Sequence, residues 1–173
     1  MLKENVGRAL NNQIAKEIYS SQLYLAMASW ADKNGYSGSA KFLYEQAEEE
    51  RLHMLKLFHY TNERGGHAIV TASEAPPAEF NSVSEVFKQV LEHEQYITES
   101  INDLVGVCID EKDFTTNSFM QWFVNEQIEE EANAQKILDR LNLLGDDRAR
   151  MYIFDRDMEK FRQANAPAPQ RNM

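Results

Sequence analysis

The segment Gln46-Ala47-Glu48-Glu49-Glu50-Arg51-Leu52-His53-Met54 combines a helical pattern with a charged residue at a core position. It contains a Glu-x-x-His pair, Glu50 and His53, and residues three apart share one face of a helix. Small and apolar residues also step through it at intervals of four and three, the spacing of a buried helix face. The stripe comprises Leu43, Ala47, Glu50, Met54 and Leu57. Because a buried carboxylate is costly unless it is paired or binds a metal, the rest of the chain is expected to supply partners for Glu50.

Composition limits the class of protein. The chain has 173 residues, of which 43% are hydrophobic and 27% are charged, as expected for one folded domain. Its net charge of -10 argues against a nucleic-acid partner and favours cations. The single cysteine, Cys108, excludes an internal disulfide framework and fits the cytoplasm. The N-terminus does not resemble a signal peptide, and no apolar run of about 18 residues predicts a membrane span.

Helix boundaries follow from glycine, proline and capping signals. Asn34-Gly35 and Gly65-Gly66 are typical helix ends, and Pro76-Pro77 excludes helix from the segment between 67 and 81. Ser82 and Glu85 fit a capping box. The expected helices run from about 4 to 33, from 37–39 to 65–66, from 83 to a break near 110–113, from that break to Gly145, and over about 147–162. Residues 163–173 are expected to form a flexible tail.

The lengths of the connections predict the topology. The first and third connections are short, so each joins an antiparallel helical hairpin. The middle connection has about 16 residues and can span roughly 50 Å when extended, whereas a helix of 27 residues is roughly 40 Å long. It is therefore expected to cross the full length of the domain. The predicted fold is all-α: a four-helix bundle over 1–162 with one long crossover and a short fifth helix.

Each of the other long helices also carries polar residues in its apolar stripe. They are Glu17 in the first helix, Glu94 in the third, and Gln127 with Glu130 in the fourth. In an antiparallel hairpin, residues equidistant from the turn lie level. The midpoint of Glu17 and Glu50 falls between 33 and 34, in the first break, and the midpoint of Glu94 and Gln127 falls between 110 and 111, in the third. Both pairs, each 33 positions apart, are therefore expected to lie level.

The two halves of the chain resemble each other weakly. Lys16-Glu17-Ile18-Tyr19 aligns with His93-Glu94-Gln95-Tyr96 at an offset of 77 residues. This similarity supports two related hairpins that close around one site.

These stripe residues predict a metal site inside the bundle. Oxygen-rich ligands with one imidazole and no thiolate suit iron or manganese and tolerate zinc. A bridging Glu50 can hold two ions, as in di-iron carboxylate bundles. The predicted ligand set is Glu17, Glu50, His53, Glu94, Gln127 and Glu130.

At these residues the sequence resembles the ferritins, specifically the haem-free bacterial type. The resemblance implies that Glu17, Glu50 and His53 bind one iron, and that Glu50, Glu94 and Glu130 bind a second, with Gln127 alongside. Tyr24 matches the tyrosine that ferritins keep beside this centre. A third iron nearby is implied at Glu49, Glu126, Glu129 and Glu130.

Other ferritin-like families fit less well. Bacterioferritins repeat Glu-x-x-His in the fourth helix and bind haem through a Met after the second-helix glutamate, whereas this chain has Gln127-x-x-Glu130 and Arg51. Haem is therefore not expected. Rubrerythrins add a cysteine-rich domain, whereas this chain has one cysteine. The DNA-protecting mini-ferritins take ligands from two subunits, whereas this chain carries a full ligand set in one bundle.

The resemblance implies a ferroxidase that oxidises Fe(II) with dioxygen or hydrogen peroxide. It further implies a cytoplasmic homo-oligomer of 24 subunits that stores ferric oxide mineral. Two alternatives stay open: a di-iron oxygenase or peroxidase acting on a separate substrate, and a structural or DNA-protecting shell, which the acidic charge disfavours.

Neighbouring residues receive simpler interpretations. Glu48 is expected to face solvent, and Trp122 to be a packing residue. His59, His67 and His93 have no partner in any stripe and are expected at the surface.

Overall fold

The protein folds as a bundle of long helices. The computed structural model describes residues 1–145 and 147–165, with side chains up to residue 161. The helices are α1 (Glu4–Lys33), α2 (Ser37–Glu63), α3 (Val83–Asp110), α4 (Phe114–Leu144) and α5 (Arg148–Asn165). The predicted four-helix bundle with a fifth, short helix is confirmed. Helix α5 ends three residues later than the expected 162, and 166–173, where most of the flexible tail was predicted, lie outside the described residues.

The helix ends follow the signals in the sequence. Gly35 and Gly145 follow α1 and α4 in positive-φ conformations of 83° and 69°, which cost glycine little. At the start of α3 the Ser82 hydroxyl accepts a hydrogen bond from the Glu85 N–H at 3.1 Å. The Glu85 carboxylate accepts from the Asn81 N–H at 2.7 Å, one residue earlier than in a standard capping box.

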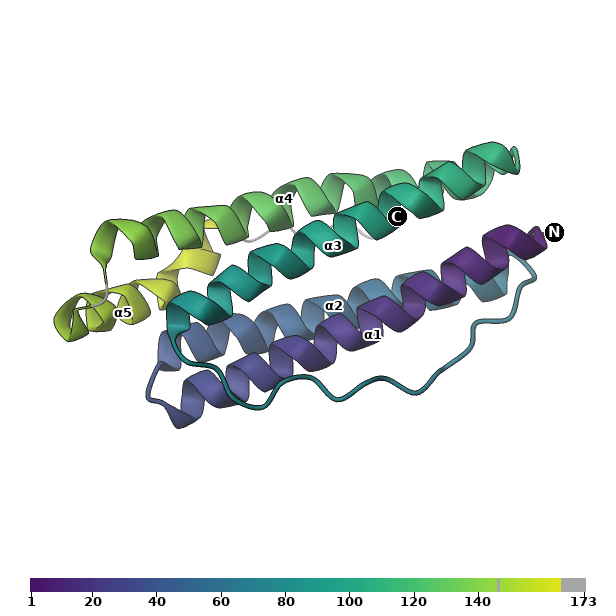
Figure 1. The fold of residues 1–173 in the computed structure, drawn as a ribbon. Coiled ribbons are helices and arrows are strands. Elements are labelled where there is room, and N and C mark those ends of the chain that lie inside the picture. The colour runs from purple at the N-terminus through teal and green to yellow at the C-terminus, as the bar shows by residue number, and fades with distance from the viewer. Residues whose placement is uncertain (146, 166–173) are drawn as a thin grey trace.

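Two hairpins and one long crossover give the topology. Helices α1 and α2 pack along each other, as do α3 and α4, and α1 also packs against α3. The crossover, residues 64–82, runs the length of the bundle, so that α2 and α3 point the same way (Figure 1). Asn11 fixes the first part of the crossover. Its side-chain NH₂ group donates to the His67 carbonyl at 3.0 Å, and its side-chain oxygen accepts from the Ile69 N–H at 2.8 Å. None of the described helices is long and apolar enough to cross a membrane.

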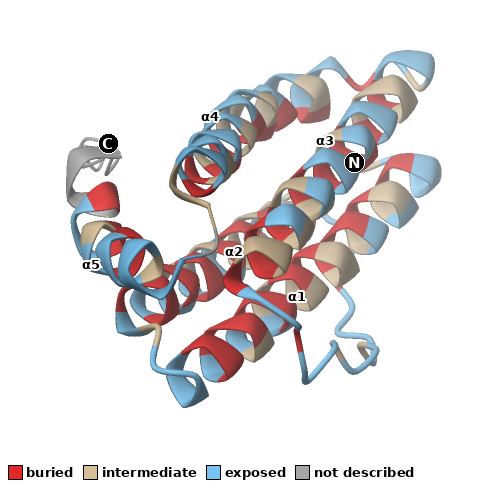
Figure 2. Cartoon of the chain, turned by 60° about the vertical axis from the view of Figure 1, so that its left-hand side comes forward, coloured by how far each residue is buried: buried red, intermediate tan, exposed pale blue. Residues whose placement is uncertain are grey.

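Buried residues lie on the facing sides of the helices (Figure 2). The apolar ones form two clusters. One cluster surrounds Met27, Leu43 and Phe87 at the end of the bundle near α5. The other surrounds Leu10, Leu57 and Phe123 at the opposite end. Between them lies a layer of buried polar residues. The layer comprises Gln13, Glu17, Ser20, Gln46, Glu50, His53, Glu94, Ser100, Gln127 and Glu130.

A buried carboxylate of α5 caps the first turn of α2, in addition to the apolar packing of α5. The Asp155 side chain accepts hydrogen bonds from the Gly38 N–H at 2.9 Å, and from the N–H and hydroxyl of Ser39, both at 2.8 Å. These are free groups of the first turn of α2, where a negative charge is favourable. Position 38 must be glycine for this contact, because a Cβ there would lie 1.8 Å from the Asp155 carbonyl oxygen.

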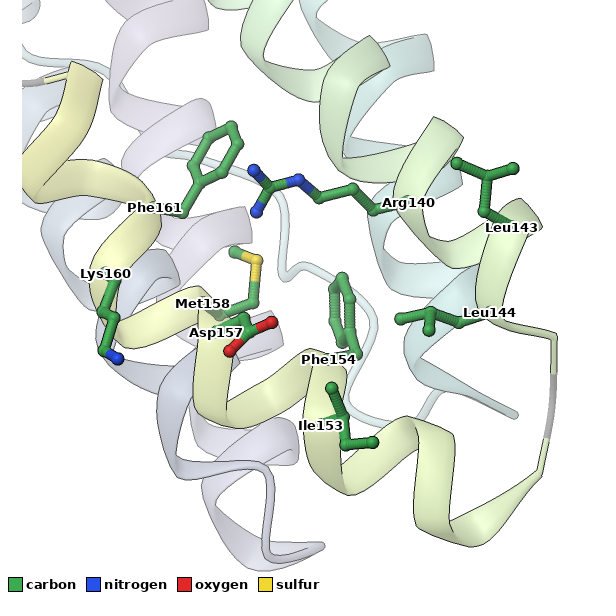
Figure 3. A pocket seen from close by; sticks show the side chains of 9 residues that line it. All are labelled: Arg140, Leu143, Leu144, Ile153, Phe154, Asp157, Met158, Lys160 and Phe161. Atoms are coloured by element: carbon green, nitrogen blue, oxygen red, sulfur yellow. The ribbon is translucent and has the colours of Figure 1, made fainter.

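A hollow of about 490 Å³ lies between α5 and the C-terminal part of α4 (Figure 3). Its walls are mainly apolar, and the Arg140 guanidinium lies 5.0 Å from the centre of the Phe161 ring. None of the carboxylates of the polar layer lines it. The buried carboxylates lie instead in the layer between the two apolar clusters.

Replacing Asp155 with alanine is expected to loosen α5. The change leaves two N–H groups and one hydroxyl without their buried acceptor, so we expect a loss of about 2–4 kcal/mol in unfolding free energy and faster proteolysis of α5. Denaturant unfolding and limited proteolysis measure both effects. The control Asp157→Ala removes an exposed pair with Arg156 and is expected to cost less than about 1 kcal/mol. Equal stability losses in the two variants would contradict the capping role.

Candidate functional site

The predicted ligands lie at one level of the bundle, between its two apolar clusters. Each long helix contributes: α1 carries Glu17 and Tyr24, α2 carries Glu50 and His53, α3 carries Glu94, and α4 carries Gln127 and Glu130. All seven side chains are buried. Glu49 and Glu126 are half-buried, and Glu129 is exposed.

The consecutive glutamates of α2 occupy three environments. Glu48 is exposed, as predicted, and forms two hydrogen bonds with Arg51 at 2.8 and 2.6 Å. Glu49 is half-buried and Glu50 is 2% exposed. A helix turns by about 100° per residue, so adjacent side chains point toward solvent, the bundle edge and the core in succession.

Glu17, Glu50 and His53 form the tightest group. One ligand atom from each lies within 4.8 Å of the others. His53 Nδ1 is 3.6 Å from a Glu50 oxygen. One Glu17 oxygen accepts from the Gln13 amide at 2.8 Å, whereas the other, Oε2, is buried without any hydrogen-bond partner. An unpaired buried carboxylate oxygen is a strong indication of a missing cation or proton.

Burial dominates the electrostatics of this group. It raises the pKa of Glu17 well above its ordinary value, and the neighbouring Glu50 raises it further. Burial likewise raises the pKa of Glu50, with a further contribution from Glu94. A cation between these carboxylates would restore their ionised forms, because opposite charge offsets the cost of burial.

Glu94 and Glu130 face the same layer from the other hairpin. The Tyr24 hydroxyl donates to one Glu94 oxygen, and the Gln127 amide donates to the other at 3.0 Å. The Gln46 amide donates to Glu130 at 3.0 Å. Neutral donors thus hold both carboxylates, and among the described residues neither joins a compact group of three ligands. Burial raises the pKa of Glu130, and the charges of Glu94 and Glu50 add to the effect.

A second compact group consists of Glu49, His53 and Glu126. It contains two of the four residues expected for the third iron, while Glu129 and Glu130 are outside it. His53 was assigned to the first group alone, although its spacing of four from Glu49 could have indicated a shared face. Because an imidazole has two nitrogens, His53 can take part in both groups. The Trp122 ring packs edge-on against His53, with 5.3 Å between the ring centroids, so Trp122 is a packing residue.

His93 lies deeper than expected. The prediction of a surface position holds only in part for this residue, which is half-buried beside the polar layer. Its Nε2 lies 2.8 Å from the Ser20 hydroxyl oxygen, and burial lowers its pKa to about 4. Gln46 and Gln13, which donate hydrogen bonds to Glu130 and Glu17, were also missed, because each lies one position before a residue of the apolar stripe and not in the stripe itself. His59 and His67 are exposed, as predicted.

The raised pKa of Glu17 predicts a pH-dependent stability. Folded metal-free protein keeps a proton on Glu17 that the unfolded chain releases above about pH 4.5, so unfolding free energy falls as pH rises from there to the raised folded pKa. We expect the unfolding temperature to be lower at about pH 8 than at about pH 5.5, and this decrease to be smaller in the Glu17→Gln variant. Scanning calorimetry measures the unfolding temperature. The control Glu48→Gln changes an exposed residue and should show the same decrease in unfolding temperature as the parent. If Glu17→Gln also showed the full decrease, Glu17 would not be the source of the pH dependence.

Comparisons with known proteins agree with this geometry. Residues 7–144 match the family model described as Ferritin, ferritin-like domain. A probable bacterial non-heme ferritin-like protein of Haemophilus influenzae is 49% identical over 158 residues, covering 91% of this chain and 96% of that protein. A bacterial non-heme ferritin of Staphylococcus saprophyticus is 41% identical over 158 residues, covering 91% and 95%.

Solved ferritin structures are also similar to this chain. The open pore ferritin of the archaeon Archaeoglobus fulgidus superposes with a TM-score of 0.89 at 42% identity, covering 91% of this chain and 96% of that one. An engineered closed form of the same ferritin gives a TM-score of 0.90 at 42% identity, covering 92% and 97%. The match spans all four long helices and the level at which their carboxylates lie, and the chain belongs to the ferritin family.

Proposed function

We propose that this protein stores iron and detoxifies it as a ferroxidase. Fe(II) is both substrate and cargo, and it is oxidised at an intrasubunit site for two ions. Glu17, Glu50 and His53 hold one ion, while Glu50, Glu94 and Glu130 hold the other with Gln127 alongside. The observation that carries this proposal is the buried Glu17–Glu50–His53 group with its unpaired Glu17 oxygen.

The chemistry of the side chains suits this reaction. Carboxylates are hard ligands that favour Fe(III) over Fe(II), so binding here lowers the cost of losing an electron. Two Fe(II) supply two electrons to dioxygen, which takes up two protons and leaves as hydrogen peroxide. Tyr24 donates a hydrogen bond to Glu94 and so orients the carboxylate that faces the second ion. The apolar clusters border the layer on both sides along the bundle.

The product needs a path to storage. Glu49 and Glu126 lie half-buried beside His53, and Glu129 is exposed on the same side of α4. Together with Glu130 they form a graded series of carboxylates from the buried layer to the surface. We infer that they receive a third iron on its way to a mineral core inside a shell of 24 subunits.

A double replacement of Glu50 and His53 by alanine tests the site. It removes the shared ligand and the imidazole, so initial Fe(II) oxidation is expected to slow by at least about 100-fold, more than typical losses for residues outside the ligand set. Absorbance of ferric product under air gives the rate. The control Glu48→Ala changes an exposed residue of the same helix and should match the parent.

Assembly is measured in the same samples. Size exclusion is expected to give about 480 kDa for both variants and the parent, which is 24 chains of 20.0 kDa. A parental oxidation rate in the double variant would show that the site is elsewhere. A parent that elutes as a monomer or dimer would remove the storage function and favour a di-iron oxygenase or peroxidase.

A further inference from the structure

A row of hydrogen bonds leads from the edge of the bundle to Glu17. The Lys16 ammonium donates to the Ser100 hydroxyl oxygen at 2.6 Å, and that hydroxyl donates to the Gln13 side-chain oxygen. The Gln13 NH₂ group then donates to Glu17 Oε1 at 2.8 Å. Lys16 is half-buried, whereas the other three residues are each at most 7% exposed. We call Lys16, Ser100 and Gln13 the donor row, and it ends at a predicted ligand.

The donor row connects the two helical hairpins. Gln13 and Lys16 belong to α1 and Ser100 belongs to α3, and these two helices pack against each other (Figure 1). Gln13 lies four residues before Glu17, so both side chains lie on one face of α1. The Lys16 ammonium meets α3 twice, at the Ser100 hydroxyl and 4.9 Å from the centre of the Tyr96 ring. A residue of the second hairpin thus takes part in holding a carboxylate of the first.

The count of protons gives the donor row one direction. An ammonium group can only donate, and a serine hydroxyl has one proton to give. Because the Ser100 oxygen accepts from Lys16, its proton goes to the Gln13 oxygen, and the Gln13 NH₂ group is left to face Glu17. In the reversed amide orientation, the Gln13 oxygen would face the Glu17 carboxylate, which only accepts when it is ionised. The Ser100 proton would also lose its acceptor.

Lys16 makes this direction unique. Without its ammonium, the Ser100 oxygen could accept from the Gln13 NH₂ group, and the Ser100 proton could go to the carbonyl four residues earlier in α3, a common arrangement for serine in a helix. Both orientations of the Gln13 amide would then be possible. In the reversed one, Glu17 Oε1 has no donor, and the carboxylate is no longer held in place.

We propose that Lys16 and Ser100 are positioning residues for the first divalent cation: they fix the Gln13 amide so that Glu17 keeps Oε1 on Gln13 and offers Oε2 to the ion. Oε2 is the buried oxygen that lacks a hydrogen-bond partner. Lys16 and Ser100 act through Gln13 and do not contact the cation. The inference rests on the proposed function, because this cation is the Fe(II) assigned to the group around Glu17.

The sign of the effect distinguishes this role from plain electrostatics. Lys16 directly precedes Glu17 in the chain, and a positive charge near a cation site repels the cation. If repulsion were its main effect, removing the ammonium would strengthen cation binding. If the ammonium instead orients Gln13, its removal weakens binding. The direction of the change in affinity therefore separates the two roles.

The test measures Zn(II), a redox-inactive cation, binding to the assembled metal-free protein by titration calorimetry. Sites in the buried layer are those that are lost in Glu50→Ala/His53→Ala. In Lys16→Met, which keeps a long side chain but removes its donors, Zn(II) is expected to bind there about tenfold more weakly, as is typical when the partner of a metal ligand is lost. Ser100→Ala should weaken binding similarly, and the combined variant should lose little more, because both act through one amide.

Two controls and a second readout accompany the titration. Lys16→Arg keeps a side chain that can only donate, so its Zn(II) affinity should stay within about threefold of the parent. Lys88→Met removes the same charge from an exposed pair with Glu92 and should match the parent. Initial rates of Fe(II) oxidation are measured against Fe(II) concentration. Lys16→Met should need about tenfold more Fe(II) for half its maximal rate and should keep the maximal rate itself.

Three outcomes overturn the inference: Zn(II) binding in Lys16→Met as tight as in the parent or tighter, a parental affinity in Ser100→Ala, or an affinity in Lys16→Arg as low as in Lys16→Met. If the parent still oxidises Fe(II) and Glu50→Ala/His53→Ala does not, only the positioning role is lost. A parent that oxidises no Fe(II), or whose Zn(II) sites do not depend on Glu50 and His53, loses the proposed function itself.

Discussion

The burial of four carboxylates between two apolar clusters is the constraint on which the structure depends. Glu17, Glu50, Glu94 and Glu130 are each at most 7% exposed. Burial is the largest cause of the raised pKa at every one of them. A chain that gains stability from apolar packing accepts such a layer only when cations or protons neutralise it. The four long helices bring the layer together, and the crossover allows the two hairpins to face each other.

The amide and phenol donors show how the protein maintains the layer. Gln13, Gln46 and Gln127 each donate to a different buried glutamate, and Tyr24 donates to Glu94. Neutral donors fix the carboxylates without cancelling their affinity for a cation, as a lysine or arginine would. Within the described part of the chain, Glu17 Oε2 is a fully buried oxygen without a hydrogen-bond partner, and it lies inside the compact group with Glu50 and His53. The site is thus ordered and still has unused capacity for a positive charge.

Much of the fold and the core of the site could be predicted from local patterns. Gly35 and Ser82 marked helix ends, and the 33-residue spacing of Glu17 and Glu50 placed them at one level because a hairpin is symmetric about its turn. Contacts between distant segments could not be predicted. Asp155 caps α2 across more than 100 residues, a contact that no periodicity encodes. His93 lies one residue from the α3 stripe, but the Tyr19 ring packs against it and the Ser20 hydroxyl lies within hydrogen-bond distance of its Nε2.

Anomalous diffraction at the iron edge from a crystal soaked in Fe(II) would locate iron in the buried layer. We expect two strong peaks inside the bundle, on either side of Glu50: one next to Glu17 and His53, the other next to Glu94 and Glu130. Iron found only at exposed carboxylates, with no peak in the buried layer, would contradict the proposed site.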